Sequence, residues 1–358
     1  MSSGASRDDA GATPFGAEAL TAPLPEPGEA GLRGEAGRGA SRMVAARAMF
    51  VSAVLVLGAG VLALLFVLSV QSIAGGSGLS WATIVIAAVM VLPLAVSRFD
   101  GMRRARQEAD AALYRLERFA TANRLDLRHR EDDPPESATV FGLGKRRMAT
   151  AVVTGSEPRP FRSADYAFDT WIGRYRMPRS LTYLRVGIAT ELPRASLVAV
   201  HAPGAPSWRP PEGQERIEIG GGFDEHFGVW CAPADGDGVR RMLTPSVRAG
   251  LAAVAPDVDV ETAGRHVYFL SRGALPRWTA PFWRWTEDLL AVAARIEEAA
   301  DPHPEPSPGG ALRSTDAERA ETRAHLFTRP AVGRPAAIGC LLPLVFGVVA
   351  GLLTATWR

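Results

Sequence analysis

The chain has 358 residues with a formal net charge of +2, and hydrophobic residues make up 47% of it. Lys145 is the only lysine among 40 basic residues, a bias typical of a GC-rich bacterial genome, so the arginine content does not indicate nucleic-acid binding. The two cysteines, Cys231 and Cys340, fall in different predicted parts of the chain. A disulfide-stabilised domain is therefore excluded, as is typical of a reducing compartment.

Residues 1–41 are rich in Gly, Ala, Pro, Ser and Glu, and their apolar side chains are few and scattered. Such a segment cannot bury enough apolar surface to offset the entropy that it loses on ordering. We therefore predict a disordered N-terminal tail that buries nothing against the rest of the protein. The tail is not a signal peptide, because the first apolar segment begins too late and a second one follows at once.

The segment 48–97 contains no Asp, Glu, Lys, Arg or His in 50 consecutive residues. A transmembrane helix needs about 20 apolar residues, so this length holds two spans and a connection. Glycine and serine gather between residues 72 and 78, which is typical of a turn. We predict a two-helix transmembrane hairpin, with spans at Met49–Val70 and Leu79–Ser97.

A third apolar segment occupies residues 335–358 and predicts another transmembrane helix. Arginines flank the three segments at Arg38, Arg42, Arg47, Arg98, Arg103, Arg104, Arg106, Arg329 and Arg334. The positive-inside rule places these arginines in the cytoplasm, and the uncharged turn of the hairpin outside. We therefore predict a protein of the cell (plasma) membrane whose N-terminus and soluble domain are cytoplasmic and whose C-terminus is outside.

Two features next to the predicted spans allow more than one interpretation. The basic cluster after the hairpin consists of Arg98, Arg103, Arg104 and Arg106. It is either the ordinary positive-inside signal or a specific site for anionic lipid. Gly347 and Gly351 have the spacing that lets two membrane helices approach closely. They pack against the first span or against a second copy of the chain, or they only reflect the frequency of glycine in membrane helices.

Residues 98–300 are predicted to form one cytoplasmic α+β domain. Apolar residues at helical spacing predict a helix from Phe99 to Asn123 that continues the second span. From Leu125 to Ser271 the hydrophobic pattern has period two, which is typical of strands with one buried face. The alternating runs are 183–188, 197–201, 216–219, 227–231 and 266–269. Most connections between them are too short for crossover helices, so we expect a mainly antiparallel sheet.

Two helices are predicted to accompany the sheet. Thr244 is an N-cap followed by a proline at the first helical position, and Thr279 begins the second helix. The second helix carries an apolar stripe of Phe282, Trp285, Leu289, Val292 and Ile296. We interpret this stripe as core packing against the sheet, with a binding groove as the alternative. Residues 301–334 are predicted to be a Pro-rich linker and a short juxtamembrane helix, with Thr315 and Glu318 as its capping box.

Candidate chemistry is sparse. The segment Gly142–Lys145 lacks the Ser or Thr and the earlier glycine of a phosphate-binding loop, so we interpret it as a tight hairpin turn. Asp224–His226 holds three metal-ligating residue types in a row, but neighbours in an extended chain point to opposite faces. We interpret this run as a solvated strand start, and Cys231 as a small buried side chain. No catalytic residue, metal ligand or cofactor is predicted.

Four segments resemble a known family. They are Leu116–Asn123, Phe168–Tyr175, Gly222–Trp230 and Leu243–Pro245. These segments are similar to blocks in a family of uncharacterised actinobacterial membrane proteins, in which a membrane helical hairpin precedes a bacterial domain of unknown function. The resemblance extends from Leu113 to Ser271 and implies this arrangement without an activity. The segment 132–144 is shorter than in the family pattern, and the third span is an addition to it.

Three functions remain open from the sequence. We favour a non-catalytic interaction or sensing domain presented at the membrane, because a domain tethered at both ends stays close to the bilayer. One alternative is a membrane-associated enzyme with a site near Asp224–His226. A second alternative is a transport accessory subunit, since spans without ionisable side chains argue against a pore or pump. The expected partners are the lipid bilayer and another membrane protein, not nucleic acid, and the oligomeric state stays open.

Overall fold

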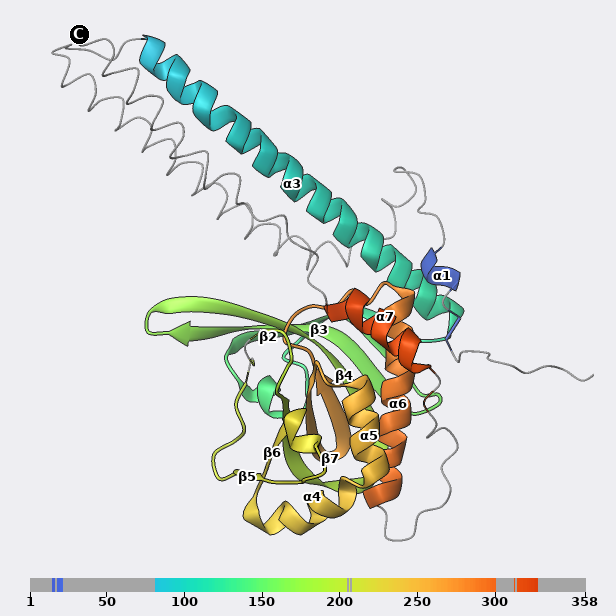
Figure 1. The fold of residues 1–358 in the computed structure, drawn as a ribbon. Coiled ribbons are helices and arrows are strands. Elements are labelled where there is room, and N and C mark those ends of the chain that lie inside the picture. Colours follow the sequence, from blue (N-terminus) through green and yellow to red (C-terminus); the bar gives the residue numbers. More distant parts are fainter. Residues whose placement is uncertain are drawn as a thin grey trace, which may run out of the picture.

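A computed structural model describes residues 15–16, 18–21, 81–204, 206, 208–300, 312 and 314–327 of the chain. Its α-helices are α1 (Glu18–Thr21), α3 (Trp81–Ala122), α4 (Gly236–Met242), α5 (Pro245–Val254), α6 (Ala280–Ala300) and α7 (Asp316–Phe327). Its strands are β1 (Asp126–Asp132), β2 (Lys145–Gly155), β3 (Phe161–Ile172), β4 (Tyr175–Ala199), β5 (Glu215–Ile217), β6 (Phe227–Cys231) and β7 (Asp259–Leu270). Short 3-10 turns lie at η2 (Thr139–Gly142), η3 (Phe223–Glu225) and η4 (Pro233–Asp235). Together these elements form an α+β domain, as predicted (Figure 1).

The strands of the described region form one seven-stranded sheet in the order β1-β2-β3-β4-β6-β5, with β7 paired to β4. Every pair is antiparallel, which confirms the prediction. β4 is 25 residues long and pairs in turn with β3, β7 and β6. The runs predicted at 183–188 and 197–201 therefore belong to one strand, as far as Ala199. Register shifts between Gly187 and Ala195 break the alternation and hide this continuity in the sequence.

Helices α5 and α6 cover one face of the sheet (Figure 1). Both begin where the sequence predicts, and the Thr244 hydroxyl accepts a hydrogen bond from the backbone N–H of Val247 at the start of α5. The apolar stripe on α6 is buried throughout: Phe282, Trp285, Leu289, Val292 and Ile296. Core packing is therefore confirmed, and the alternative of a binding groove along this stripe is wrong.

The other face of the sheet is also buried, which corrects the prediction of strands with one buried face. Leu184 and Phe269 belong to the main core beneath the helices, whereas Tyr183 and Tyr268 belong to a second core. The ring of Phe141 in η2 covers that second core, with its centroid 4.9 Å from the Tyr183 ring. The sequence pattern fails here because tyrosine can serve either as a polar surface residue or as a buried aromatic with a bonded hydroxyl.

Part of the predicted N-terminal tail packs on the domain. The side chain of Phe15 is only 3% exposed, and its ring lies against Phe119, Phe161 and Trp283. Leu20 in α1 is buried as well. The prediction that the tail buries nothing is therefore wrong at these positions. A single phenylalanine hardly changes the composition of a 41-residue segment, yet its side chain can be buried among aromatic rings of the domain. Within residues 1–41, the structure describes only 15–16 and 18–21.

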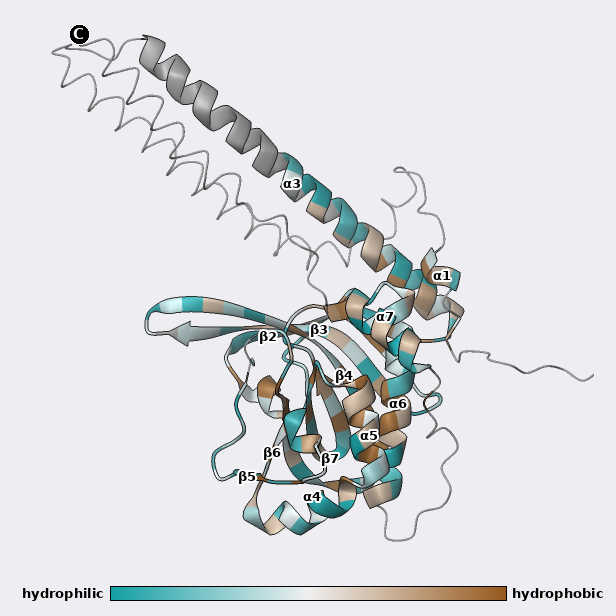
Figure 2. Ribbon diagram, viewed as in Figure 1, coloured by the Kyte–Doolittle hydropathy of each residue, from teal (hydrophilic) through white to brown (hydrophobic). Residues whose placement is uncertain are grey.

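Helix α3 is one continuous helix of 42 residues, so the helix predicted from Phe99 is its second half. Hydrophilic and hydrophobic side chains are mixed along the part of that half whose hydropathy Figure 2 shows. Within the residues that the structure describes, no helix is both long enough and apolar enough to cross a membrane. The predicted spans at Met49–Val70 and 335–358 lie outside those residues, as does the start of Leu79–Ser97. The membrane-spanning part of the predicted fold class therefore stays a prediction.

Helix α7 has the predicted capping box. The backbone N–H of Thr315 donates to the Glu318 carboxylate at 2.7 Å, and the N–H of Glu318 donates to the Thr315 hydroxyl at 3.3 Å. The helix packs on the domain, with the Phe327 ring centroid 5.7 Å from that of Trp285. Its Arg323 forms an ion pair with Asp257. The predicted Pro-rich linker, residues 301–310, lies outside the described residues.

Candidate interaction surface

Strands β3 and β4 continue beyond the sheet as a two-stranded arm. Strand β2 begins at Lys145, opposite Asp169, and β7 ends opposite Tyr183. Past these points the two strands pair only with each other, as far as the two-residue turn Gly173–Arg174. Gly173 has a φ of +58°, which the tight turns of β-hairpins require. We call residues Asp169–Pro178 the β-arm; Figure 1 shows it projecting as a green hairpin.

The β-arm carries large apolar side chains in water. Five such side chains are exposed among the residues that the structure describes, and three of them lie in the arm. They are Trp171, Tyr175 and Met177, with exposed fractions of 45%, 64% and 39%. Single exposed apolar residues are ordinary on proteins, but a group of them within one short segment marks an interaction site.

Cations accompany these aromatic rings. The Arg174 guanidinium lies 5.4 Å from the Tyr175 ring centroid, and the Lys145 ammonium lies 5.9 Å from the Trp171 centroid. Such cation–π contacts contribute about 0.5–1 kcal/mol at exposed sites and leave most of the cation's N–H donors available. In contrast, Arg176 is paired with the Asp169 carboxylate. The arm therefore offers aromatic faces together with positive charge.

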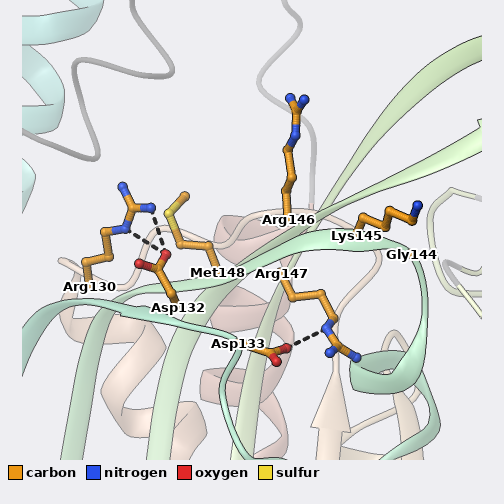
Figure 3. Close-up of a pocket in the computed structure, with 8 residues that line it drawn as sticks. All are labelled: Arg130, Asp132, Asp133, Gly144, Lys145, Arg146, Arg147 and Met148. Carbon is orange, nitrogen blue, oxygen red and sulfur yellow. Dashed lines mark hydrogen bonds and ion pairs between the residues drawn. The ribbon is translucent and has the colours of Figure 1, made fainter.

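A cavity of about 520 Å³ lies at the base of the β-arm, and we call it the basic pocket. Its lining holds the ion pairs Arg130–Asp132 and Arg147–Asp133, together with Gly144, Lys145, Arg146 and Met148. In each pair the arginine charge is balanced by the aspartate charge, at N–O distances of 2.7 Å for Arg130–Asp132 and 2.6 Å for Arg147–Asp133. Figure 3 shows Arg146 and Lys145 pointing away from both pairs. The excess charge of the pocket is therefore carried by Lys145 and Arg146.

The segment Gly142–Lys145 is not the predicted tight hairpin turn: it comprises the last residue of η2, a bend at 143–144 and the first residue of β2. The bend sets the position of Lys145. Gly144 has a φ of +68°, and a Cβ atom there would lie 2.4 Å from the backbone oxygen of Asp169. Only glycine combines this conformation with so close an approach. The backbone at Gly144 can therefore pack closely against β3, which places Lys145 at the junction between the basic pocket and the β-arm.

A buried polar network lies on the second face of the sheet. Its members are Glu131, Glu136, Arg162, Tyr183, Arg185 and Tyr268. The Glu136 carboxylate accepts hydrogen bonds from the Tyr183 and Tyr268 hydroxyls and from Arg185, and it forms an ion pair with Arg162 at 3.0 Å. Burial raises the pKa of the Tyr183 phenol, and the nearby Glu136 carboxylate raises it further. The network joins the loop that carries Glu136 to β1, β3, β4 and β7 on this face of the sheet.

The run Asp224–His226 is not part of an extended strand. It lies in η3 and the residue after it, which corrects the predicted extended strand start. The Asp224 carboxylate accepts backbone hydrogen bonds from Ile219 at 3.2 Å and Gly220 at 2.7 Å, so it holds its own loop. No group of three metal-ligating side chains occurs among the described residues. Cys231 is buried, as predicted, and burial raises the pKa of its thiol.

The remaining predicted site residues stay predictions. Of the four arginines assigned to anionic lipid, Arg103 and Arg104 are exposed on α3, and the side chains of Arg98 and Arg106 lie outside the described part. Gly347 and Gly351, assigned to helix packing, also lie outside it. The β-arm itself was not predicted from the sequence. Its signal is Gly173 between two runs of β-forming residues, which predicts a hairpin but not how far it projects.

No protein-family model matches the chain, and no curated protein matches it. Among solved structures, the chain is similar to the crystal structure of the mycobacterial trehalose monomycolate transport factor A, TtfA. The TM-score is 0.36 and the sequence identity 14%. The alignment covers 54% of this chain and 98% of that chain.

Proposed function

We propose that the chain is a membrane-anchored, non-catalytic domain that binds at the membrane surface through its β-arm. The observation that carries this proposal is the grouping of Trp171, Tyr175 and Met177 on an arm that projects from the sheet. Burying such side chains contributes about 25 cal/mol per Å² of apolar surface. Aromatic side chains next to arginine are also the residue types that dominate binding energy at protein interfaces.

The sequence supports the anchoring. Residues 48–97 carry no charge, residues 335–358 are apolar, and arginines flank both segments on the predicted cytoplasmic side. In the view of Figure 1, the β-arm and the N-terminal half of α3 leave the domain toward the same side. An anchor that continues into α3 keeps the arm at high effective concentration near any partner in the membrane.

The chemistry of the buried charges supports a non-catalytic role. Glu136 is engaged by two arginines and two tyrosines. Glu261 accepts hydrogen bonds from the backbone and hydroxyl of Thr139 and from Arg194. Asp224, the carboxylate of the enzyme alternative, is engaged by backbone N–H groups. Carboxylates that are engaged in this way stabilise the fold, and this is the role that we propose for all three.

Photo-crosslinking tests the role of the arm. A photoreactive phenylalanine analogue replaces Tyr175 in the full chain, in native membranes. Trp278 is the matched control, since it is also an aromatic residue and its side chain is 38% exposed. We expect adducts from position 175 and far fewer from position 278. Equal yields at both positions, or none at 175, contradict the proposal.

Reporter fusions test the anchoring and its orientation. We expect fusions at Gly76 and after Arg358 to be outside the cell, and a fusion at Pro304 to be in the cytoplasm. The reason is the distribution of arginines around the apolar segments. A fusion at Pro304 that is outside contradicts the orientation, and it also contradicts the reducing environment expected for Cys231.

A further inference from the structure

The β-arm and the basic pocket adjoin each other at Lys145. Lys145 joins them, because it lines the pocket while its ammonium group lies over the Trp171 ring. Arg146 is adjacent to it, and Arg174 lies at the tip of the arm. Within the described residues none of these three cations forms an ion pair with a carboxylate. Within the arm Trp171 pairs with Arg176 and Ile172 pairs with Tyr175, so the side chains of Trp171 and Tyr175 lie on opposite faces of the hairpin. We call Lys145, Arg146, Trp171, Arg174 and Tyr175 the basic-aromatic surface.

The residue types of this surface are those that bind the interface of a bilayer, where lipid phosphate groups lie next to hydrocarbon. Lysine and arginine donate strong hydrogen bonds to phosphate oxygens, and they keep several donors free here. Tryptophan and tyrosine prefer the depth of lipid headgroups, where the ring meets hydrocarbon and the polar atom meets water. Each basic side chain near an anionic leaflet strengthens binding by a factor of about five.

The shape and the tether indicate which anionic partner it meets. Three of its five residues lie on a projecting hairpin, and Lys145 and Arg146 line the basic pocket at the base of that hairpin. A thin hairpin with an aromatic ring on each face fits a broad and deformable layer. The arm's one carboxylate, on Asp169, is neutralised by Arg176. The anchor would hold the arm beside a bilayer at all times, whereas a soluble acidic protein would have to be captured from solution. We infer that the basic-aromatic surface docks on anionic lipid headgroups of the bilayer that anchors the chain; this rests on the proposed membrane anchoring.

Hydrogen exchange on the full chain in lipid nanodiscs tests this inference. Amides of the β-arm are compared in discs of neutral phosphatidylcholine and in discs that also contain anionic phosphatidylglycerol. We expect exchange in the arm to be slower in the anionic discs by about fivefold or more. The difference should disappear in about 1 M salt, where the Debye length falls to about 3 Å. Strand β5, at one edge of the sheet, is the internal reference and should exchange equally in both.

Charge reversal provides the matched variants. Arg146→Glu combined with Arg174→Glu changes two exposed side chains, and it should abolish the lipid-dependent protection of the arm. Arg240→Glu combined with Arg241→Glu makes the same change in net charge on α4, which lies away from the arm in Figure 1. This control should keep the protection. Because all four side chains are exposed, neither variant is expected to unfold the domain.

Four results overturn the inference. Equal exchange of the arm in neutral and anionic discs shows that lipid charge plays no part. Protection in neutral discs on adding inorganic phosphate assigns the surface to a free anion. Photo-adducts from position 175 that contain protein and no lipid leave the proposed function intact but replace its partner. A chain that alkaline carbonate removes from membranes contradicts the anchoring itself, and both proposals fail with it.

Discussion

The ring of Phe15 lies against the ring of Trp283, with centroids 5.6 Å apart and an angle of 68° between the planes. This edge-to-face contact joins the N-terminal segment to α6. The main chain is held too, because the N–H of Phe15 donates to the Glu287 carboxylate at 3.2 Å. On the next residue, Gly16, both the N–H and the carbonyl bond to the Asn123 side chain at the end of α3. The segment therefore ties α3 to α6.

Replacing Phe15 should destabilise the domain. A buried Phe→Ala substitution typically costs about 3–5 kcal/mol. For Phe15→Ala we expect a loss of about 2–3 kcal/mol in the free energy of unfolding, because the short segment can detach instead of leaving a cavity. Chemical denaturation measures the loss, and Glu18→Ala, an exposed residue of the same segment, is the control. If both variants unfold alike, the segment does not contribute to the core.

Asn123 and Phe15 should be thermodynamically coupled. The Asn123 amide holds Gly16 through two hydrogen bonds, at 2.7 and 3.3 Å, so it acts on the same docked segment. Once Phe15→Ala has loosened the segment, Asn123→Ala should cause a smaller further loss of stability. A double-mutant cycle should give an interaction energy of about 0.5–1 kcal/mol. Additive effects contradict the common docking.

Two neighbouring glycines should differ sharply in their tolerance of alanine. At Gly144 a Cβ atom would meet the backbone of Asp169, and the residue has a positive φ. At Gly142 no atom lies within 4 Å of a Cβ. We expect Gly144→Ala to cost about 2 kcal/mol or more, and Gly142→Ala to cost within about 0.5 kcal/mol. Thermal melting of both variants measures this; similar costs contradict the close approach of the turn to β3.

Substitutions of Asp224 and His226 should show whether this run stabilises its own loop or binds a metal ion. Asp224→Ala removes an acceptor of two backbone hydrogen bonds, and we expect it to cost about 1–3 kcal/mol. His226→Ala should cost within about 0.5 kcal/mol, since its side chain makes no hydrogen bond to the loop within the described part of the chain. Neither variant should change the metal content of the purified protein. Stoichiometric zinc that is lost in His226→Ala would revive the enzyme alternative.

His266 should make the stability depend on pH. Burial lowers the pKa of its imidazole, and the nearby Arg185 lowers it further, against the opposing effect of Glu136. The unfolded state therefore takes up its proton first as the pH falls. The domain should lose stability as the pH falls below about 6.5, the ordinary value for histidine. His266→Asn should lose less over the same range. A variant with an unchanged pH dependence contradicts this assignment.

Local signals in the sequence were enough for several elements. The N-cap at Thr244, the capping box of Thr315 and Glu318, and the stripe on α6 all depend on residues within a few turns of one helix. Strand β6 was predicted because Phe227–Cys231 alternates without a register shift. Such features follow from backbone geometry and short-range hydrogen bonds, which the order of residues encodes directly.

The candidate surface could be predicted only in its parts. Gly173 between β-forming residues indicates a hairpin, and Gly142–Lys145 indicates a turn. Their meeting depends on the register that places Lys145 opposite Asp169. The exposure of Trp171 depends on where the neighbouring strands end. Neither the register nor the strand ends can be derived from either segment alone.

By itself, the sequence determined the class of the domain, its antiparallel sheet, and which helices pack on it, because period and capping are local properties. Only the tertiary structure decided that Phe15 enters the core, that Tyr183 is buried while its neighbour Leu184 faces a different core, and that the β-arm projects with its aromatic rings in water. These outcomes depend on contacts between segments that are distant in the chain. A side chain's burial is a property of the pocket that receives it, and that pocket exists only after the chain has folded.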